Sequence, residues 1–169
     1  MIGLPNEHDI VAMFPYRPGM ELLVAASNGR GFIVDGEEAV AQTRAGKQVL
    51  TPAEGAAARV CAPAQSGDAV AFVGDNRRML IVKLDEIPLM TCGRGIILQR
   101  YKSGGLADAK VFRLAEGLSW RQGDPRDGPQ GPAARGRIRI ETNLGLWLGA
   151  RGAAGRLVPT GFPRSSRFG

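Results

Sequence analysis

The sequence predicts an all-β fold, built as a propeller-like array of four-stranded units that we call blades. Three observations predict it: the chain repeats itself at a fixed offset, each repeat holds short apolar runs separated by turn residues, and about four such runs fit in roughly 50 residues. One blade of this size cannot bury its own apolar face, so neighbouring blades are expected to share a core.

The repeat has an offset of 48 residues. When residues 28–50 are placed over residues 76–98 without a gap, seven of the 23 positions are identical, whereas chance would give about one or two. The identical pairs are Asn28 and Asn76, Arg30 and Arg78, Ile33 and Ile81, Val34 and Val82, Glu38 and Glu86, Thr43 and Thr91, and Leu50 and Leu98.

Each repeat begins with a predicted β-hairpin. In the first, the apolar runs 21–26 and 32–34 flank a turn that carries Asn28. In the second, the runs 68–73 and 79–82 flank an equivalent turn. Asn followed by Gly or Arg between two apolar runs is a hairpin signal.

Further elements follow each hairpin in the same order, and a third and a fourth strand are expected in each repeat. The elements are an acidic linker (35–38 and 85–86), a loop with basic residues and glycine (43–47 and 91–95), a third apolar run (48–50 and 96–98) and a fourth run (58–62 and 109–114). Residues 7–19 supply one or two strands more, either the last of a preceding blade or the first of this one.

The composition changes after Trp120, so we divide the chain into blades (1–120), a flexible loop rich in Gly, Pro and Arg (121–137), and a C-terminal strand or helix with a tail (138–169). Large apolar residues within 141–157 have a partly helical spacing, which predicts a short helix there. Four glycines in that range weaken it.

The chain carries 22 Lys and Arg against 16 Asp and Glu, a net charge of +6. This excess favours polyanionic partners, with nucleic acid ahead of an anionic membrane. No stretch approaches the ~20 apolar residues of a membrane span, so we predict a cytoplasmic protein. Cys61, Cys92 and the single His8 form no metal-binding motif, and the two cysteines are expected to be reduced core thiols.

The candidate binding residues are cations at hairpin turns and in glycine-bearing loops. If blades pack side by side, equivalent loops emerge on one face and their cations can contact a phosphate backbone. Without a recognition helix or a zinc finger, the predicted binding is not sequence-specific. The residues are Arg30, Arg44, Lys47, Arg77, Arg78, Arg94, Arg100 and Lys102.

Catalysis by this chain is not predicted. Tyr16 and Tyr101 each lie beside basic residues, as DNA-cleaving tyrosines can. Neither comes with an acidic cluster to hold magnesium, so we interpret both as packing or stacking residues. The stretch at 93–95 lacks the spacing of a nucleotide-binding loop.

Several stretches resemble the C-terminal domain of the A subunit of bacterial DNA topoisomerase IV, in the gyrase A and topoisomerase IV A family, and in particular its alphaproteobacterial type. The resemblance is most specific in GRGIILQRYKSGGLADAKVF (93–112) and GFPRSSRFG (161–169). It implies a partial β-pinwheel, a propeller-like disc of four-stranded blades that binds and bends double-stranded DNA along its basic rim.

The resemblance also implies site residues and partners. QRYKSGG (99–105) is the nearest match to the QRRGGKG box of gyrase, which adds Gln99 to the DNA-binding set, and its degeneracy fits a topoisomerase IV that bends DNA without strong wrapping. The family's catalytic tyrosine lies upstream of the matched region, so this chain alone is expected to have no catalytic residue and no cofactor. The full, nucleoid-associated enzyme would add ATP, magnesium, the remainder of the A subunit, plus the B subunit. The alternative hypothesis is a protein-interaction repeat that does not bind DNA.

Overall fold

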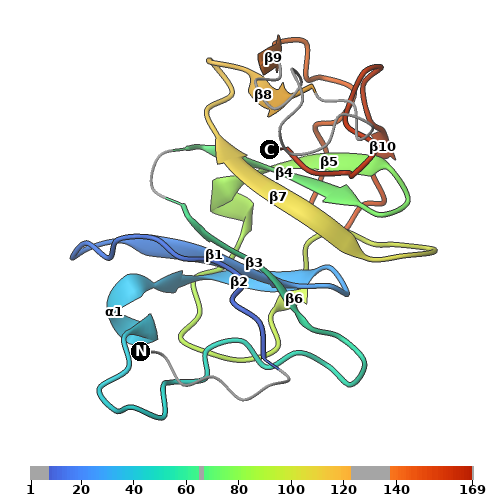
Figure 1. The fold of residues 1–169 in the computed structure, drawn as a ribbon. Helices are drawn as coiled ribbons and strands as arrows, with labels where there is room; N and C mark the ends of the chain where they lie inside the picture. The colour runs from blue at the N-terminus through green and yellow to red at the C-terminus, as the bar shows by residue number, and fades with distance from the viewer. Residues whose placement is uncertain (1–7, 65–66, 123–137, 169) are drawn as a thin grey trace, which may run out of the picture.

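The computed structural model describes residues 8–64, 67–122 and 138–168, which form an almost entirely β structure (Figure 1). A four-residue helix, α1 (Gly36–Ala39), and a 3-10 turn, η1 (Leu84–Glu86), occupy the two predicted acidic linkers. The strands are β1 (Glu21–Ala26), β2 (Arg30–Asp35), β3 (Ala58–Pro63), β4 (Ala69–Gly74), β5 (Arg78–Lys83), β6 (Ile96–Ile97), β7 (Leu106–Phe112), β8 (Leu118–Arg121), β9 (Ile138–Glu141) and β10 (Arg156–Leu157).

Both predicted hairpins are present and have the same register. Leu23 pairs with Ile33 in the β1–β2 hairpin, and Ala71 pairs with Ile81 in the β4–β5 hairpin, at positions 48 residues later. All six residues of β4 are buried. Strands buried on both faces read as continuous apolar runs rather than alternating ones, which explains the sequence pattern.

The predicted fourth strands are also confirmed, as β3 and β7. β3 pairs with β1, and β7 pairs with β4, each antiparallel. Both pairings shift register at the equivalent point, between Ala25 and Ala26 in the first sheet and between Val73 and Gly74 in the second. The 48-residue repeat therefore reproduces even an irregularity of the ladder.

The predicted third strand at 96–98 is confirmed as β6, but it joins the sheet of the preceding hairpin. The strand orders are β3-β1-β2-β6 and β10-β5-β4-β7, so β6 pairs with β2 of the preceding hairpin and not with β5. The chain crosses back because Ile33 donates its N–H to the carbonyl of Pro88 and accepts from the N–H of Met90. The second repeat therefore supplies a strand to the sheet of the first repeat, an arrangement that we call strand exchange. The run at 48–50 contributes only an isolated bridge from Leu50 to Gly93.

The predicted helix within 141–157 is wrong. This stretch repeats the strand exchange: the N–H of Ile81 donates to the carbonyl of Trp147, Gly149 donates to the carbonyl of Ile81, and β10 pairs with β5. Gly152 and Gly155 have positive φ values of 88° and 79°, which a right-handed helix excludes. The apolar spacing reflects burial of Leu144 and Trp147 in a non-helical segment.

β8 and β9 pair antiparallel in a separate two-stranded sheet. The C-terminal tail completes its packing, because the N–H of Arg121 donates to the carbonyl of Phe168 and the rings of Phe162 and Phe168 lie 5.4 Å apart, centroid to centroid. Trp120 lies at the same 5.4 Å from Phe162. Most of the predicted flexible loop, 123–137, lies outside the described residues.

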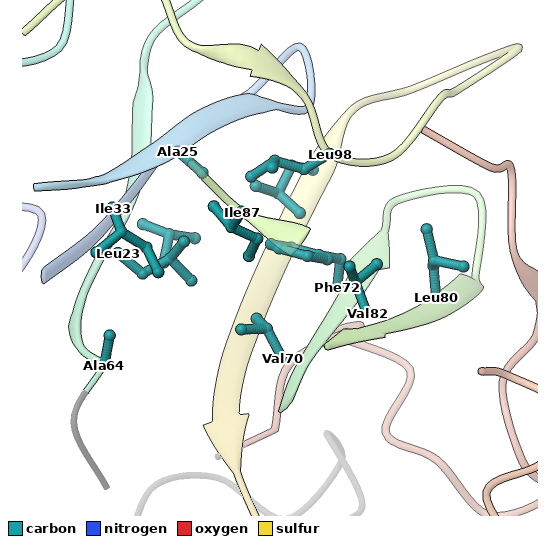
Figure 2. Packing of buried hydrophobic residues seen from close by; sticks show 12 residues of the cluster. Leu23, Ala25, Ile33, Ala64, Val70, Phe72, Leu80, Val82, Ile87 and Leu98 are labelled. Carbon is teal, nitrogen blue, oxygen red and sulfur yellow. The ribbon is translucent and has the colours of Figure 1, made fainter. Parts of the chain in front are cut away.

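The main core lies between the two four-stranded sheets, where side chains from both meet (Figure 2). Leu23 and Ile33 come from the first sheet, and Val70 and Phe72 from the second, while Leu98 enters from the segment after β6. Cys61 is half-buried, but Cys92 is exposed, which corrects its assignment to the core. No helix in the described part of the chain is long and apolar enough to cross a membrane.

We predict that Phe72→Ala lowers the free energy of unfolding by about 3–5 kcal/mol, because a fully buried aromatic ring is replaced by a cavity. Urea denaturation followed by circular dichroism measures the change. Leu157→Ala, at a side chain that is 67% exposed, is the control and should change the unfolding free energy by less than about 0.5 kcal/mol. Equal denaturation midpoints for Phe72→Ala and the unaltered chain would contradict this core.

Candidate nucleic-acid interface

Three segments come together on one side of the molecule, at the right of Figure 1: the β1–β2 turn, the β4–β5 turn and the loop between β6 and β7. Backbone hydrogen bonds join them, since Leu106 donates to the carbonyl of Ser27 and Asp75 donates to the carbonyl of Gly105. We call residues 27–30, 75–78 and 99–105 the turn rim. It contains five of the predicted binding cations.

The two hairpin turns have the same construction. The side-chain oxygen of Asn28 accepts a hydrogen bond from the backbone N–H of Arg30 at 3.2 Å, and Asn76 accepts from the N–H of Arg78 at 3.1 Å. An Asn side chain that caps the backbone two residues on is a turn-forming contact. The identical Asn and Arg pairs of the repeat thus have a local physical cause.

Arg30 and Arg78 make equivalent contacts with the returning strands. Nη1 of Arg30 donates to the carbonyl of Gly95 at 3.5 Å, just before β6. Nη1 of Arg78 donates to the carbonyl of Gly155 at 3.2 Å, just before β10. A guanidinium has five N–H donors, so each arginine retains donors for an anion while the protein holds it in place.

Arg77 is committed to the C-terminal tail. Its Nη1 donates to the carbonyl of Pro163 at 2.8 Å and its Nη2 to the carbonyl of Phe162 at 3.1 Å. Its φ is 59°, a left-handed conformation taken by Gly29 at the equivalent turn position. Arg77 therefore has fewer free donors than Arg78.

Gln99 does not face solvent, which corrects its assignment to the DNA-contacting set. Its side chain is 0% exposed. Its amide nitrogen donates to the carbonyl of Arg78 at 3.2 Å and to that of Ala154 at 3.0 Å, and its amide oxygen accepts from the hydroxyl of Tyr101 at 2.9 Å. The neighbouring Arg100 and Lys102 are exposed.

The remaining three predicted cations form a separate group. Arg44, Lys47 and Arg94 are exposed, in loops that meet where Thr51 donates to the carbonyl of Gly93. Nζ of Lys47 lies 3.3 Å from a carboxylate oxygen of Glu38. An exposed pair of this kind contributes ~1 kcal/mol at most and leaves the lysine available.

The sequence interpretation missed two exposed arginines in the segment that returns to the second sheet. Arg156 lies in β10, and Arg151 precedes it and donates from Nη1 to the carbonyl of Ile97 at 3.4 Å. β10 corresponds to β6 at an offset of 60 residues, since Ile97 pairs with Arg30 and Leu157 with Arg78. An offset of 48 cannot detect this equivalence.

Tyr101 is a packing residue, as predicted. It contacts the core between the sheets, and burial, with the negative charge of Asp75 second, raises the pKa of its phenol. Among the described residues, no group of His, Cys, Asp and Glu could hold a metal ion. A protonated phenol that donates to a buried amide is poorly prepared to act as a nucleophile.

Sequence comparison identifies relatives of the chain. The family model described as "DNA gyrase C-terminal domain, beta-propeller" matches residues 21–51 and 68–106. The A subunit of DNA topoisomerase 4 of Rickettsia prowazekii is 40% identical over 163 residues, which are 96% of this chain and 20% of the relative. The same subunit of Caulobacter vibrioides is 39% identical over 169 residues, which are 99% of this chain and 20% of the relative. The chain therefore spans a small part of these relatives.

Solved structures share the fold. The C-terminal domain of E. coli ParC superposes with a TM-score of 0.74 at 23% sequence identity, covering 96% of this chain and 65% of that chain. The C-terminal domain of DNA gyrase A gives a TM-score of 0.65 at 11% identity, covering 84% of this chain and 48% of that one.

The family model and the topoisomerase 4 relatives define the class: the chain belongs to the family of DNA gyrase C-terminal domains. The solved structures show the same β-propeller-like fold. Within this family it is a C-terminal domain of the kind found in the A subunit of DNA topoisomerase 4. The partial β-pinwheel predicted from the sequence is thereby confirmed as a fold class.

Gly29→Ala is predicted to destabilise the turn rim far more than Gly46→Ala. The two glycines have φ values of 82° and 81°, so both variants incur about 1–2 kcal/mol for a left-handed alanine. A methyl group at Gly29 would overlap the carbonyl of Gln99 and the ring of Tyr101, whereas nothing lies within 4 Å at Gly46. We expect about 1–3 kcal/mol of additional loss at Gly29 from overpacking. Urea denaturation of both variants measures the difference, and equal losses would contradict the contact.

The phenol of Tyr101 is predicted to ionise above the ordinary tyrosine pKa of ~10. Because the pKa is raised in the folded state, the stability that it contributes is fully present below pH ~10 and is lost as pH rises through the folded value. Absorbance at 295 nm, compared between the unaltered chain and Tyr101→Phe, isolates this ionisation. A difference spectrum that titrates at the ordinary value would show that the phenol is not buried.

Proposed function

We propose that this chain is a nonspecific DNA-binding and DNA-bending module, the C-terminal part of a topoisomerase IV A subunit. The observation that carries the proposal is the equivalent bracing of Arg30 and Arg78 at successive turns, with exposed Arg100 and Lys102 beside them. Cations repeated at the spacing of a structural unit suit a phosphate backbone, which is itself a repeat of charges. Base readout has no support, since the described residues place no recognition helix on this side.

In the full protein, this module would steer duplex DNA toward ATP-dependent strand passage, the reaction that separates linked chromosomes and relaxes supercoils. Its partners would be double-stranded DNA, the remainder of the A subunit, plus the B subunit, in the cytoplasm at the nucleoid. ATP and magnesium would bind outside this chain. For the chain alone we expect DNA binding without strand cleavage.

The test is the salt dependence of binding to a random-sequence duplex, measured by fluorescence anisotropy. If the four cations Arg30, Arg78, Arg100 and Lys102 each neutralise one phosphate, log affinity should fall with log salt at a slope of about −3 to −4, at −0.9 per contact. The double variant Arg100→Gln with Lys102→Gln should reduce the magnitude of this slope by about 2.

The matched control removes two charges at the opposite end of the hairpins. Lys83 ends β5, and Arg17 lies shortly before β1, so both are distant from the turns along their strands. Arg17→Gln with Lys83→Gln should leave the slope unchanged. A flat salt response of the unaltered chain, or no binding at low salt, would instead favour the protein-interaction hypothesis. An equal loss in both double variants would exclude a localised rim.

A further inference from the structure

The loop between β6 and β7 is bonded to both sheets. On the side of the first sheet, the N–H of Leu98 donates to the carbonyl of Gly29 at 2.8 Å, and the N–H of Leu106 donates to the carbonyl of Ser27 at 2.7 Å. On the side of the second sheet, the carbonyl of Gly105 accepts from the N–H of Asp75 at 2.8 Å. The loop therefore links the two hairpin turns.

Gln99 adds a buried link to the second sheet. Both hydrogens of its side-chain amide are used, by carbonyls of Arg78 on β5 and Ala154 before β10. Its oxygen is used by the hydroxyl of Tyr101. A side chain that is 0% exposed and has every polar atom bonded has one orientation available, so it fixes the loop against the second sheet.

Tyr101 fills the space between the two turns. A methyl group added to Gly29 would lie 2.8 Å from Cε2 of the ring, and one added to Gly74 would lie 2.5 Å from Cε1. The two atoms are on opposite edges of the ring. The ring therefore separates the first turn from the end of β4 and sets how closely the hairpins approach each other.

The segment alternates between inward and outward residues. Gln99 and Tyr101 point into the protein, while Arg100 and Lys102 are exposed. We propose that Gln99 and Tyr101 are positioning residues for DNA: they fix the angle between the two hairpin turns, and this angle sets the curvature of a duplex lying across the turn rim. The proposal rests on the DNA binding proposed above.

The physical reason is that bending a duplex costs elastic energy, which contacts must offset along the curve. Cations on turns that moved independently would bind a straight duplex with as many phosphate contacts. Cations on turns held at a fixed angle favour the bent form. The cations therefore determine the number of phosphate contacts, and the buried pair determines the bend.

The test separates these two quantities with the full 169-residue chain and a duplex of about 40 base pairs, shorter than the persistence length of DNA and labelled with a dye at each end. Energy transfer between the dyes reports the bend, and the slope of log affinity against log salt reports phosphate contacts. We expect Gln99→Met to keep the slope within about 0.5 of the unaltered chain, less than one phosphate contact. The increase in energy transfer that accompanies binding should be reduced by about half or more, because part of the complexes no longer bend the duplex.

Two further variants control for a general loss of stability. Tyr101→Ala should lose the bend in the same way. Tyr101→Phe loses the hydroxyl bond to Gln99 but retains the ring and the two amide bonds of Gln99, and should keep most of the bend. Leu118→Ala, in β8, opens a cavity in a core cluster that includes neither Gln99 nor Tyr101, and should leave the bend unchanged. If Gln99→Met proves unfolded by circular dichroism, Tyr101→Ala against Tyr101→Phe decides the question.

The outcomes distinguish the two proposals. If the unaltered chain does not bind the duplex, DNA binding itself is refuted. If it binds and bends DNA, but Gln99→Met and Tyr101→Ala bend it equally well, the positioning role is overturned. An equal loss of bend in Leu118→Ala would also overturn it, by showing that any destabilised core produces the effect.

Discussion

Strand exchange between successive repeats is the constraint on which the rest of the structure depends. β6 completes the sheet of the hairpin before it, and β10 does the same for the next. Neither four-stranded sheet can therefore form from one repeat alone. The exchange also brings Gly95 to Arg30 and Gly155 to Arg78, so the placement of the two turn arginines is a product of sheet assembly.

The hairpins could be predicted from the sequence because their causes are local. Apolar runs mark the strands, and Asn28 and Asn76 cap the turns. The exchange itself could not, since the run at 96–98 predicts β6 but not its partner, and β10 has two residues and carries no periodicity. The pairing of β6 with β2 and of β10 with β5 depends on hydrogen bonds between residues far apart in the chain. The apolar spacing around Trp147 predicts a helix because local periodicity carries no information about such pairing.

In the candidate site, too, residues with a local cause could be predicted and residues placed by long-range contacts could not. Arg30 and Arg78 were found because they repeat at 48 residues and lie at turns, where side chains reach solvent. Gln99 was misassigned because the family's motif does not reveal which of its residues face inward, and burial alternates along it. Arg151 and Arg156 were missed because an inserted length between the hairpin and the returning strand changes the offset to 60.

Arg77 occupies a backbone conformation that glycine takes in the first turn, and its guanidinium is held by carbonyls of Phe162 and Pro163, 85 and 86 residues away in sequence. A left-handed non-glycine residue is strained, and the tail supplies the contacts that offset this strain. The consequence is a mechanical linkage between the C-terminus and the second turn. Displacing the tail would remove both side-chain bonds of Arg77 and leave only the bond within the turn from its N–H to the carbonyl of Gly74, so this turn is directly coupled to residues 162 and 163.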